Sequence, residues 1–134
     1  MNRACPVVLR YKNSQLELLA FKHPDAGNQL VKGNIDMGEH LDAACIRELK
    51  EESGIQAQFV KQLGIWEPGF KNQIWGICLM HYEGVLPDKW DFDTHDDGGH
   101  IFSFFWQPLD GRLNDDWNDL YTRAFHYIKD ALEK

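Results

Sequence analysis

Three glutamates in one short stretch have the types and spacing that metal chemistry requires. Glu48, Glu51 and Glu52 stand at positions i, i+3 and i+4, which on a helix places them within roughly a 100° arc. Like charges this close repel one another, and burying even one unpaired carboxylate is costly. The same arc carries the apolar residues Ala44 and Cys45, so the acids need compensation. A hard divalent cation with oxygen ligands is the simplest candidate.

The alternative is an ordinary solvated helix in which Arg47 and Lys50 offset the acids. That alternative leaves the position of the acids unexplained, because they lie near the C-terminus of the expected helix, where the helix dipole disfavours negative charge. The preceding loop supplies the deciding pattern. The chain reads Gly33, five residues, Glu39, seven residues, Arg47-Glu48-Leu49, one residue, Glu51-Glu52, one residue, Gly54-Ile55.

This segment resembles the Nudix box, the signature of the Nudix hydrolase family, and it meets every fixed position of that pattern. Seven polar or glycine positions and two apolar ones are specified over 23 residues, so the signal is strong. Farther along, the run from Trp106 to Asp110 looks like the W-x-P-L-D ending of the family's last strand. One departure is Lys32, because many members carry a second glycine immediately before Gly33.

The resemblance implies a fold and an activity. The implied fold is α+β, a Nudix-type α/β/α sandwich with a mixed β-sheet, a central Nudix helix and a C-terminal helix, and residues 1–134 would form a single domain. The implied enzyme is a pyrophosphohydrolase that uses Mg²⁺ or Mn²⁺ while water attacks a phosphorus of a nucleoside diphosphate linked to another moiety. The expected partner is therefore a small nucleotide-type substrate, and a homodimer is possible because dimers are usual among relatives.

The resemblance also assigns roles position by position. Glu48, Glu51 and Glu52 would be metal ligands together with the backbone carbonyl of Lys32, which does not require glycine. Either Glu48 or Glu52 would also orient the attacking water, and Arg47 would hold the glutamates by a charge-assisted fork.

Further positions would have auxiliary roles. Glu39 would be an auxiliary ligand, and Gly33 would supply the tight loop. Asp96 or Asp97 would add an acid from the loop before the last strand, although no spacing selects between them. An aromatic side chain in or just after residues 66–70 could stack on a base.

The elements that position these residues follow from hydrophobic patterning. A helix is expected over residues 41–53, with Gly54 as its C-terminal stop. Residues 7–11 and 16–21 read as a hairpin, and residues 58–66, 73–82 and 100–106 read as strands rich in aromatic and branched side chains. A terminal helix is expected with Asn114 as its N-cap.

Composition limits the partners. The formal net charge of −7 lies in residues 88–119, which hold nine Asp and no Glu against Lys89 and Arg112. Long nucleic acid is not expected, because its binding needs clustered Lys and Arg. No run approaches the roughly 18 apolar residues of a membrane span, and the three cysteines form no CxxC motif. We therefore expect no membrane partner and a cytoplasmic location.

Two rival functions remain open at this stage. One is an RNA 5′-end pyrophosphohydrolase, which the missing basic track makes less natural. The other is a Nudix-fold nucleotide-binding or regulatory module without turnover. Such modules commonly lose glutamates of the box, whereas all of them are present here.

Overall fold

The computed structural model describes residues 1–95 and 98–134, and its elements form an α+β fold with two helices. The fold class predicted from the sequence is confirmed. The helices are α1 (Leu41–Ser53) and α2 (Asp119–Leu132). The strands are β1 (Arg3–Val7), β2 (Leu9–Lys12), β3 (Gln15–His23), β4 (Gly27–Gln29), β5 (Gly33–Asn34), β6 (Gln58–Trp66), β7 (Trp75–His81), β8 (Trp90–Asp93) and β9 (Ile101–Pro108).

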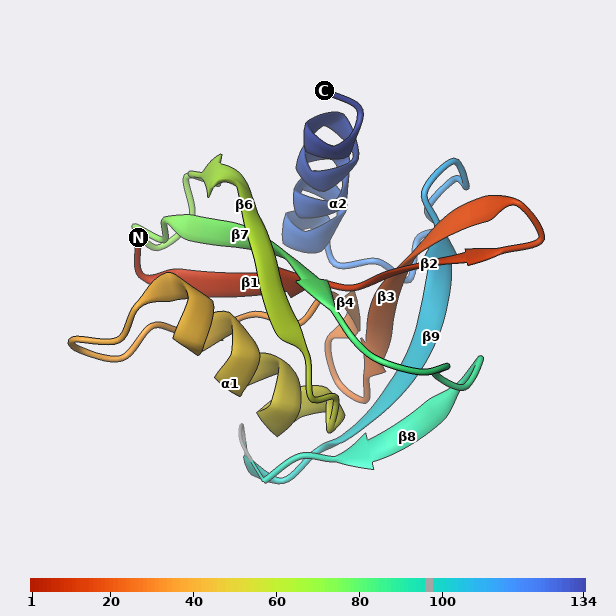
Figure 1. The fold of residues 1–134 in the computed structure, drawn as a ribbon, viewed down its shortest axis with the longest axis horizontal. Coiled ribbons are helices and arrows are strands. Elements are labelled where there is room, and N and C mark those ends of the chain that lie inside the picture. Colours follow the sequence, from red (N-terminus) through yellow and green to blue (C-terminus); the bar gives the residue numbers. More distant parts are fainter. Residues whose placement is uncertain (96–97) are drawn as a thin grey trace.

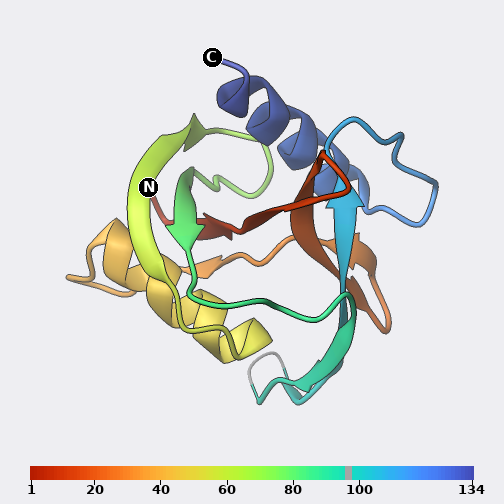
Figure 2. The same cartoon turned by 45° about the vertical axis from the view of Figure 1, so that its right-hand side comes forward.

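The strands form two sheets. One has the order β5-β1-β7-β6 and is mixed, because β1 and β7 run parallel while the other pairs are antiparallel. The other is antiparallel, with the order β2-β3-β9-β8 and with β4 added beside β3. The chain passes from one sheet to the other between β1 and β2, so that the two sheets curl around a common centre (Figures 1 and 2).

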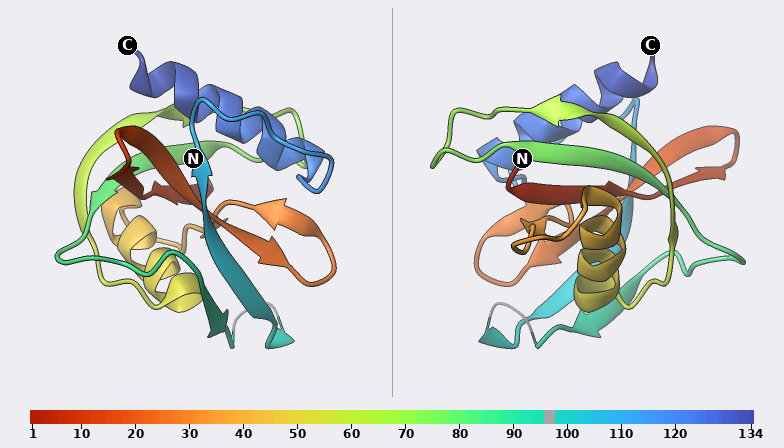
Figure 3. Two further views of the ribbon diagram at one scale, coloured as in Figure 1. Left: turned by 90° about the vertical axis from the view of Figure 1, so that its right-hand side faces the viewer. Right: turned by 60° about the vertical axis from the view of Figure 1, so that its left-hand side comes forward.

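The two helices cover opposite faces of the strands (Figures 1 and 3). Ala44, Cys45 and Leu49 of α1 belong to one buried apolar cluster. Tyr121, Phe125 and Ile128 of α2 belong to the other. Side chains of a strand alternate between faces, and neighbouring residues of β1 accordingly divide between the clusters, Ala4 facing α1 and Cys5 facing α2. This alternation fixes the sandwich.

The expected helix over residues 41–53, the strand over residues 58–66 and the hairpin are present, the hairpin being β2 and β3. The terminal helix begins later than predicted. Its N-cap is Asn118, whose side chain accepts a hydrogen bond from the Leu120 N–H. The predicted cap Asn114 instead accepts from the Asp116 N–H in a turn, a local bond that competes with helix formation.

The described cysteines, Cys5, Cys45 and Cys78, are all buried as free thiols. Burial raises the pKa of the Cys5 thiol, and a hydrogen bond with Cys78 raises that of Cys45. Because the thiolate is the reactive form, these side chains act as small apolar core residues. Within the part of the chain that the structure describes, no helix is both long and apolar enough to cross a membrane.

Gly54 ends α1 and provides a test of the fold. Its φ of +80° is left-handed, its N–H donates to the Lys50 carbonyl, and a Cβ there would fall 2.7 Å from the Phe92 ring. We expect Gly54→Ala to lower the free energy of unfolding by about 1–2 kcal/mol from the backbone alone, and by more from the contact with Phe92. Urea unfolding measures the change.

Gly84→Ala is the matched control. Gly84 has a φ of +87°, but a Cβ there would meet no atom within 4 Å, so only the backbone cost applies. Equal losses in the two variants would show that Phe92 does not restrict Gly54.

Candidate active site

Helix α1 presents the glutamates, and contacts from outside the helix hold its C-terminal end. The last carbonyls of a helix lack partners inside it. Here the Thr94 hydroxyl donates to the Glu51 carbonyl at 3.1 Å, and the Trp90 indole N–H donates to the Ser53 carbonyl at 3.3 Å. Strand β8 and the residue that follows it therefore fix the turn of helix that carries Glu51 and Glu52.

Arg47 gathers the acidic residues of the site. Its Nε and Nη2 donate to the two carboxylate oxygens of Glu39, each at 2.8 Å. Its Nη1 donates to Glu48 at 2.8 Å and to Glu51 at 3.1 Å, while Nη2 also donates to the Asn34 carbonyl at 2.9 Å. One guanidinium thus ties two glutamates of α1 to the loop before the helix, using the fork geometry that suits arginine.

This network shifts the protonation of its members. The hydrogen bonds from Arg47, followed by one from the Asp36 N–H, lower the pKa of Glu39 from 4.5 to about 2. The hydrogen bonds to Glu39 also raise the pKa of Arg47, although partial burial of the guanidinium opposes this. Glu39 therefore remains a carboxylate, and Arg47 remains charged, over the whole physiological range.

Gly33 leaves room for one of the glutamates. A Cβ at Gly33 would lie 1.9 Å from the carboxyl carbon of Glu48 and 2.1 and 2.3 Å from its oxygens. Real Cβ atoms do not approach this closely, so any side chain at position 33 would displace the carboxylate. The glycine lets the backbone of β5 approach the helix at this point.

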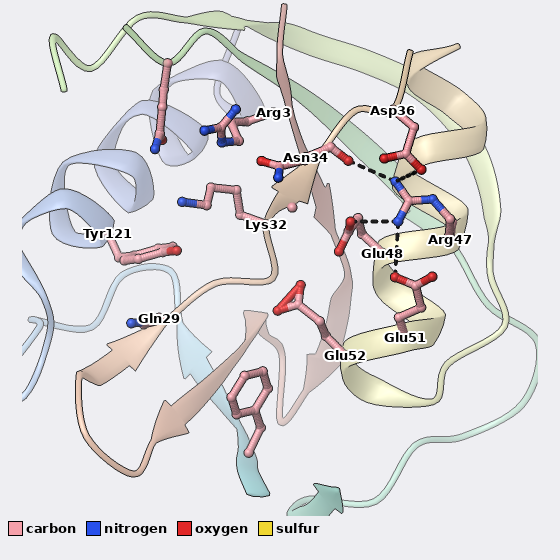
Figure 4. Close-up of a pocket in the computed structure, with 13 residues that line it drawn as sticks. Arg3, Gln29, Lys32, Asn34, Asp36, Arg47, Glu48, Glu51, Glu52 and Tyr121 are labelled. Atoms are coloured by element: carbon pink, nitrogen blue, oxygen red, sulfur yellow. Dashed lines mark hydrogen bonds and ion pairs between the residues drawn. The ribbon is translucent and has the colours of Figure 1, made fainter. Parts of the chain in front are cut away.

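A cavity of about 520 Å³ opens beside α1. Glu48 and Glu52 are only 7% and 9% exposed, although both reach its surface. Figure 4 shows the three glutamates on one side and Arg3 and Lys32 across from them. The lining residues are Arg3, Gln29, Lys32, Gly33, Asn34, Asp36, Arg47, Glu48, Glu51, Glu52, Gln73, Phe102 and Tyr121.

The donor set suits a hard divalent cation. Glu48, Glu51 and Glu52 line one cavity together with Lys32 and Gly33, and such cations prefer oxygen ligands. Among residues 1–95 and 98–134, no three acidic, histidine or cysteine side chains converge closely enough to form a ready-made cage. Glu48 and Glu51 are bonded to Arg47, so cation binding would require their carboxylates to be shared between Arg47 and the cation or their side chains to turn.

The structure gathers most of the residues singled out in the sequence. Glu48, Glu51, Glu52, Arg47, Lys32 and Gly33 line one cavity, and Glu39 contacts it through Arg47. Asp96 and Asp97 lie outside the described residues. Their proposed roles stay predictions.

Apart from Lys32, sequence reasoning missed the far side of this cavity. Arg3 reaches it because β1 pairs with both β5 and β7, which sets Arg3 opposite Asn34 and Trp75. Among the described residues, the aromatic side chains that line the cavity are Phe102 and Tyr121. Trp75, in the strand after residues 66–70, is wholly buried. Residue types alone held no signal for these positions, since strand pairing brings them together.

Fold and site together define a loop–helix–loop carboxylate site on an α+β sandwich. The chain belongs to the NUDIX family, whose domain model matches residues 1–124. The chain is also similar to the ADP-ribose pyrophosphatase of Saccharomyces cerevisiae, with 33% identity over 84 residues. That match covers 57% of this chain and 36% of the yeast protein, so the chain spans little more than a third of that relative's length.

Solved structures share the fold at lower identity. An ADP-ribose pyrophosphatase from Streptococcus suis has a TM-score of 0.69 at 14% identity, covering 98% of this chain and 88% of that one. A NUDIX-family hydrolase from Clostridium perfringens has a TM-score of 0.66 at 14% identity, covering 97% and 96%. The NUDIX domain of Shewanella oneidensis NrtR, complexed with ADP ribose, has a TM-score of 0.59 at 15% identity, covering 97% and 86%.

The bond between Arg47 and Glu39 predicts a pH dependence of stability. Because the pKa of Glu39 falls on folding, the folded protein holds this proton less tightly than the unfolded chain. Its stabilising contribution is complete above about pH 4.5 and is lost as the pH falls towards 2. Glu39→Gln should therefore destabilise the protein at pH 6, and the difference from wild type should shrink by pH 2.5.

Urea unfolding at the two pH values measures this difference. The control is Glu67→Gln, which removes an exposed glutamate that forms no ion pair with any described residue. A Glu39→Gln effect of the same size at both pH values would contradict the role of the ionised carboxylate.

Gly33→Ala tests the approach of the loop to Glu48. The methyl group would occupy the space of the Glu48 carboxylate. The Glu48 carboxylate must therefore move out of its present position. If Glu48 takes part in catalysis, a displacement on the order of 1 Å should lower kcat about a hundredfold. Steady-state kinetics measures the loss, and circular dichroism checks that the helix content is unchanged. A folded Gly33→Ala variant with the wild-type kcat would contradict the prediction that displacing the Glu48 carboxylate impairs catalysis.

Proposed function

We propose that this chain is a metal-dependent pyrophosphohydrolase that cleaves a nucleoside diphosphate linked to another moiety. The observation that carries the proposal is the set of three α1 glutamates that line one polar cavity. Two of them, Glu48 and Glu51, are held by Arg47, and Gly33 leaves room for Glu48. Water would attack a phosphorus of the diphosphate, and the bridging P–O bond would break to give two phosphorylated products.

Four groups would hold the cation, which we expect to be Mg²⁺ or Mn²⁺. They are the side chains of Glu48, Glu51 and Glu52 and the backbone carbonyl of Lys32. When bound, the cation would neutralise phosphate oxygens, polarise the phosphorus and lower the pKa of a ligated water.

The remaining chemistry belongs to the side chains. Glu52 and Glu48 are both buried carboxylates at the cavity, and either one can accept the proton of the attacking water. Arg47 positions Glu48 and Glu51 without needing to touch the substrate, because its donors are already directed at the loop and the glutamates.

ADP-ribose is the first substrate to test. The yeast and Streptococcus suis relatives are ADP-ribose pyrophosphatases, and the NrtR domain was solved with ADP ribose. A cavity of about 520 Å³ suits part of a small ligand rather than a long RNA. We expect the protein to work in the cytoplasm, with a homodimer as a possible assembly.

A nucleotide-binding module without turnover is the second candidate. It is favoured by one comparison: the NUDIX domain of Shewanella oneidensis NrtR, which shares the fold, was solved in complex with ADP ribose. The two candidates differ in whether product forms, so they are separated by a direct assay.

Glu52→Gln and Glu48→Gln test catalysis. Each should lower kcat by about a hundredfold or more, because a metal ligand or proton acceptor is lost. Removal of divalent cations with EDTA should abolish turnover, and Mg²⁺ or Mn²⁺ should restore it. Phosphorus NMR measures product with ADP-ribose, NADH, nucleotide sugars, dinucleoside polyphosphates, nucleoside triphosphates and CoA.

Glu67→Gln is the charge-matched control and should keep wild-type kcat. Full metal-dependent activity in both glutamate variants would refute the assignment of the catalytic site. Tight nucleotide binding with no product from any substrate would favour the binding module.

A further inference from the structure

The cavity has two walls of opposite charge. Glu48, Glu51 and Glu52 lie on α1, whereas Arg3 and Lys32 extend from β1 and from the segment before β5 (Figure 4). Arg47 is occupied by the acids. A bound cation would explain the acidic wall. The opposite wall calls for its own explanation.

Lys32 is a half-buried cation that rests on aromatic rings. Its Nζ lies 5.1 Å from the centre of the Trp75 ring and 5.6 Å from that of Tyr121. It forms no ion pair with any described residue. Arg3 lines the same cavity, so two positive charges converge here at a cost that an apolar side chain would avoid.

Arg3 and Gln73 extend this wall. Arg3 donates from Nη1 to the Asn2 carbonyl at 3.1 Å, and within residues 1–95 and 98–134 it has no carboxylate partner. The Gln73 side-chain oxygen accepts from the Trp75 indole N–H at 2.8 Å, which leaves its amide N–H groups as donors. Both residues line the cavity. The wall thus offers donors from a guanidinium, an ammonium and an amide.

Phosphate oxygens match these donors. They accept several hydrogen bonds at once and carry the negative charge that Arg and Lys bind best. A nucleobase fits less well, because the only aromatic side chains lining the cavity among the described residues are Phe102 and Tyr121, 2% and 7% exposed.

We propose that Arg3, Lys32 and Gln73 form a metal-independent anion subsite for the substrate's diphosphate. It would hold the oxygens that face away from the α1 glutamates. This inference rests on the proposed function, since it specifies which part of the substrate the far wall binds. It makes Arg3 and Lys32 specificity-determining residues that select a doubly charged linkage.

Calorimetric titration with inorganic pyrophosphate in EDTA tests the subsite without turnover. Titrations use wild type and the Glu52→Gln background, in which one repelling carboxylate charge is removed. Lys32→Met keeps a long apolar side chain against Trp75 and Tyr121, and Arg3→Gln keeps a polar one. Each should weaken pyrophosphate binding by roughly tenfold or more, as expected for the loss of a charge-assisted hydrogen bond.

Matched controls remove the same charges elsewhere. Lys61 and Arg112 are exposed, so Lys61→Met and Arg112→Gln should leave the affinity within about twofold, because screening weakens distant surface charges. Thermal unfolding supplies a second readout. Lys32→Met should keep or raise Tm because a desolvated charge is removed, which separates lost binding from lost folding.

The outcomes distinguish the subsite from catalysis. Pyrophosphate affinity unchanged in both Lys32→Met and Arg3→Gln, or absent from wild type and Glu52→Gln at millimolar concentration, would overturn the subsite while leaving the catalytic glutamates untouched. Conversely, Glu52→Gln and Glu48→Gln variants with full activity would reject the catalytic proposal, whereas the metal-free titration would still decide on the subsite.

Discussion

The Arg47 guanidinium is the interaction on which the site depends. Three carboxylates within one turn of a helix repel each other, and two of them are nearly buried. Arg47 offsets this repulsion by bonding Glu48 and Glu51 on the helix and Glu39 in the loop. Because the same guanidinium reaches the Asn34 carbonyl, the loop, β5 and α1 take a single arrangement. The charged side chains of the site therefore also fix the backbone of the segments that carry them.

The sandwich places an opposite charge across from the glutamates. Strand β1 is central in its sheet, and its antiparallel pairing with β5 and parallel pairing with β7 bring Arg3 and Trp75 together. Lys32 then lies over Trp75 and Tyr121, which come from the cluster covered by α2. Helix α2 therefore supports the wall that carries Arg3 and Lys32, while α1 supplies the acidic wall. The cavity is thus lined by residues from both helices.

Local signals made some elements predictable. Helix α1 follows from apolar spacing and a glycine stop, and β6 from its branched and aromatic residues; both have the predicted bounds. The predicted start of α2 was wrong because Asn114 and Asn118 are both residues that can cap a helix. Strand β8 was missed because its four residues include two aspartates, which disfavour strands, and pairing with β9 overrides that preference.

The sequence by itself determined the acidic half of the site. Helical periodicity sets the relative positions of Glu48, Glu51 and Glu52, and Arg47 and Glu39 lie within nine residues of Glu48, so short-range geometry suffices. Only the tertiary structure decided the other half. Arg3, Gln73 and Tyr121 are far apart in the chain, and each joins the cavity through strand pairing or helix packing. The spacing of side chains along a helix follows directly from the sequence. Contact between strands that are distant in the chain depends instead on which pairing register buries the apolar core.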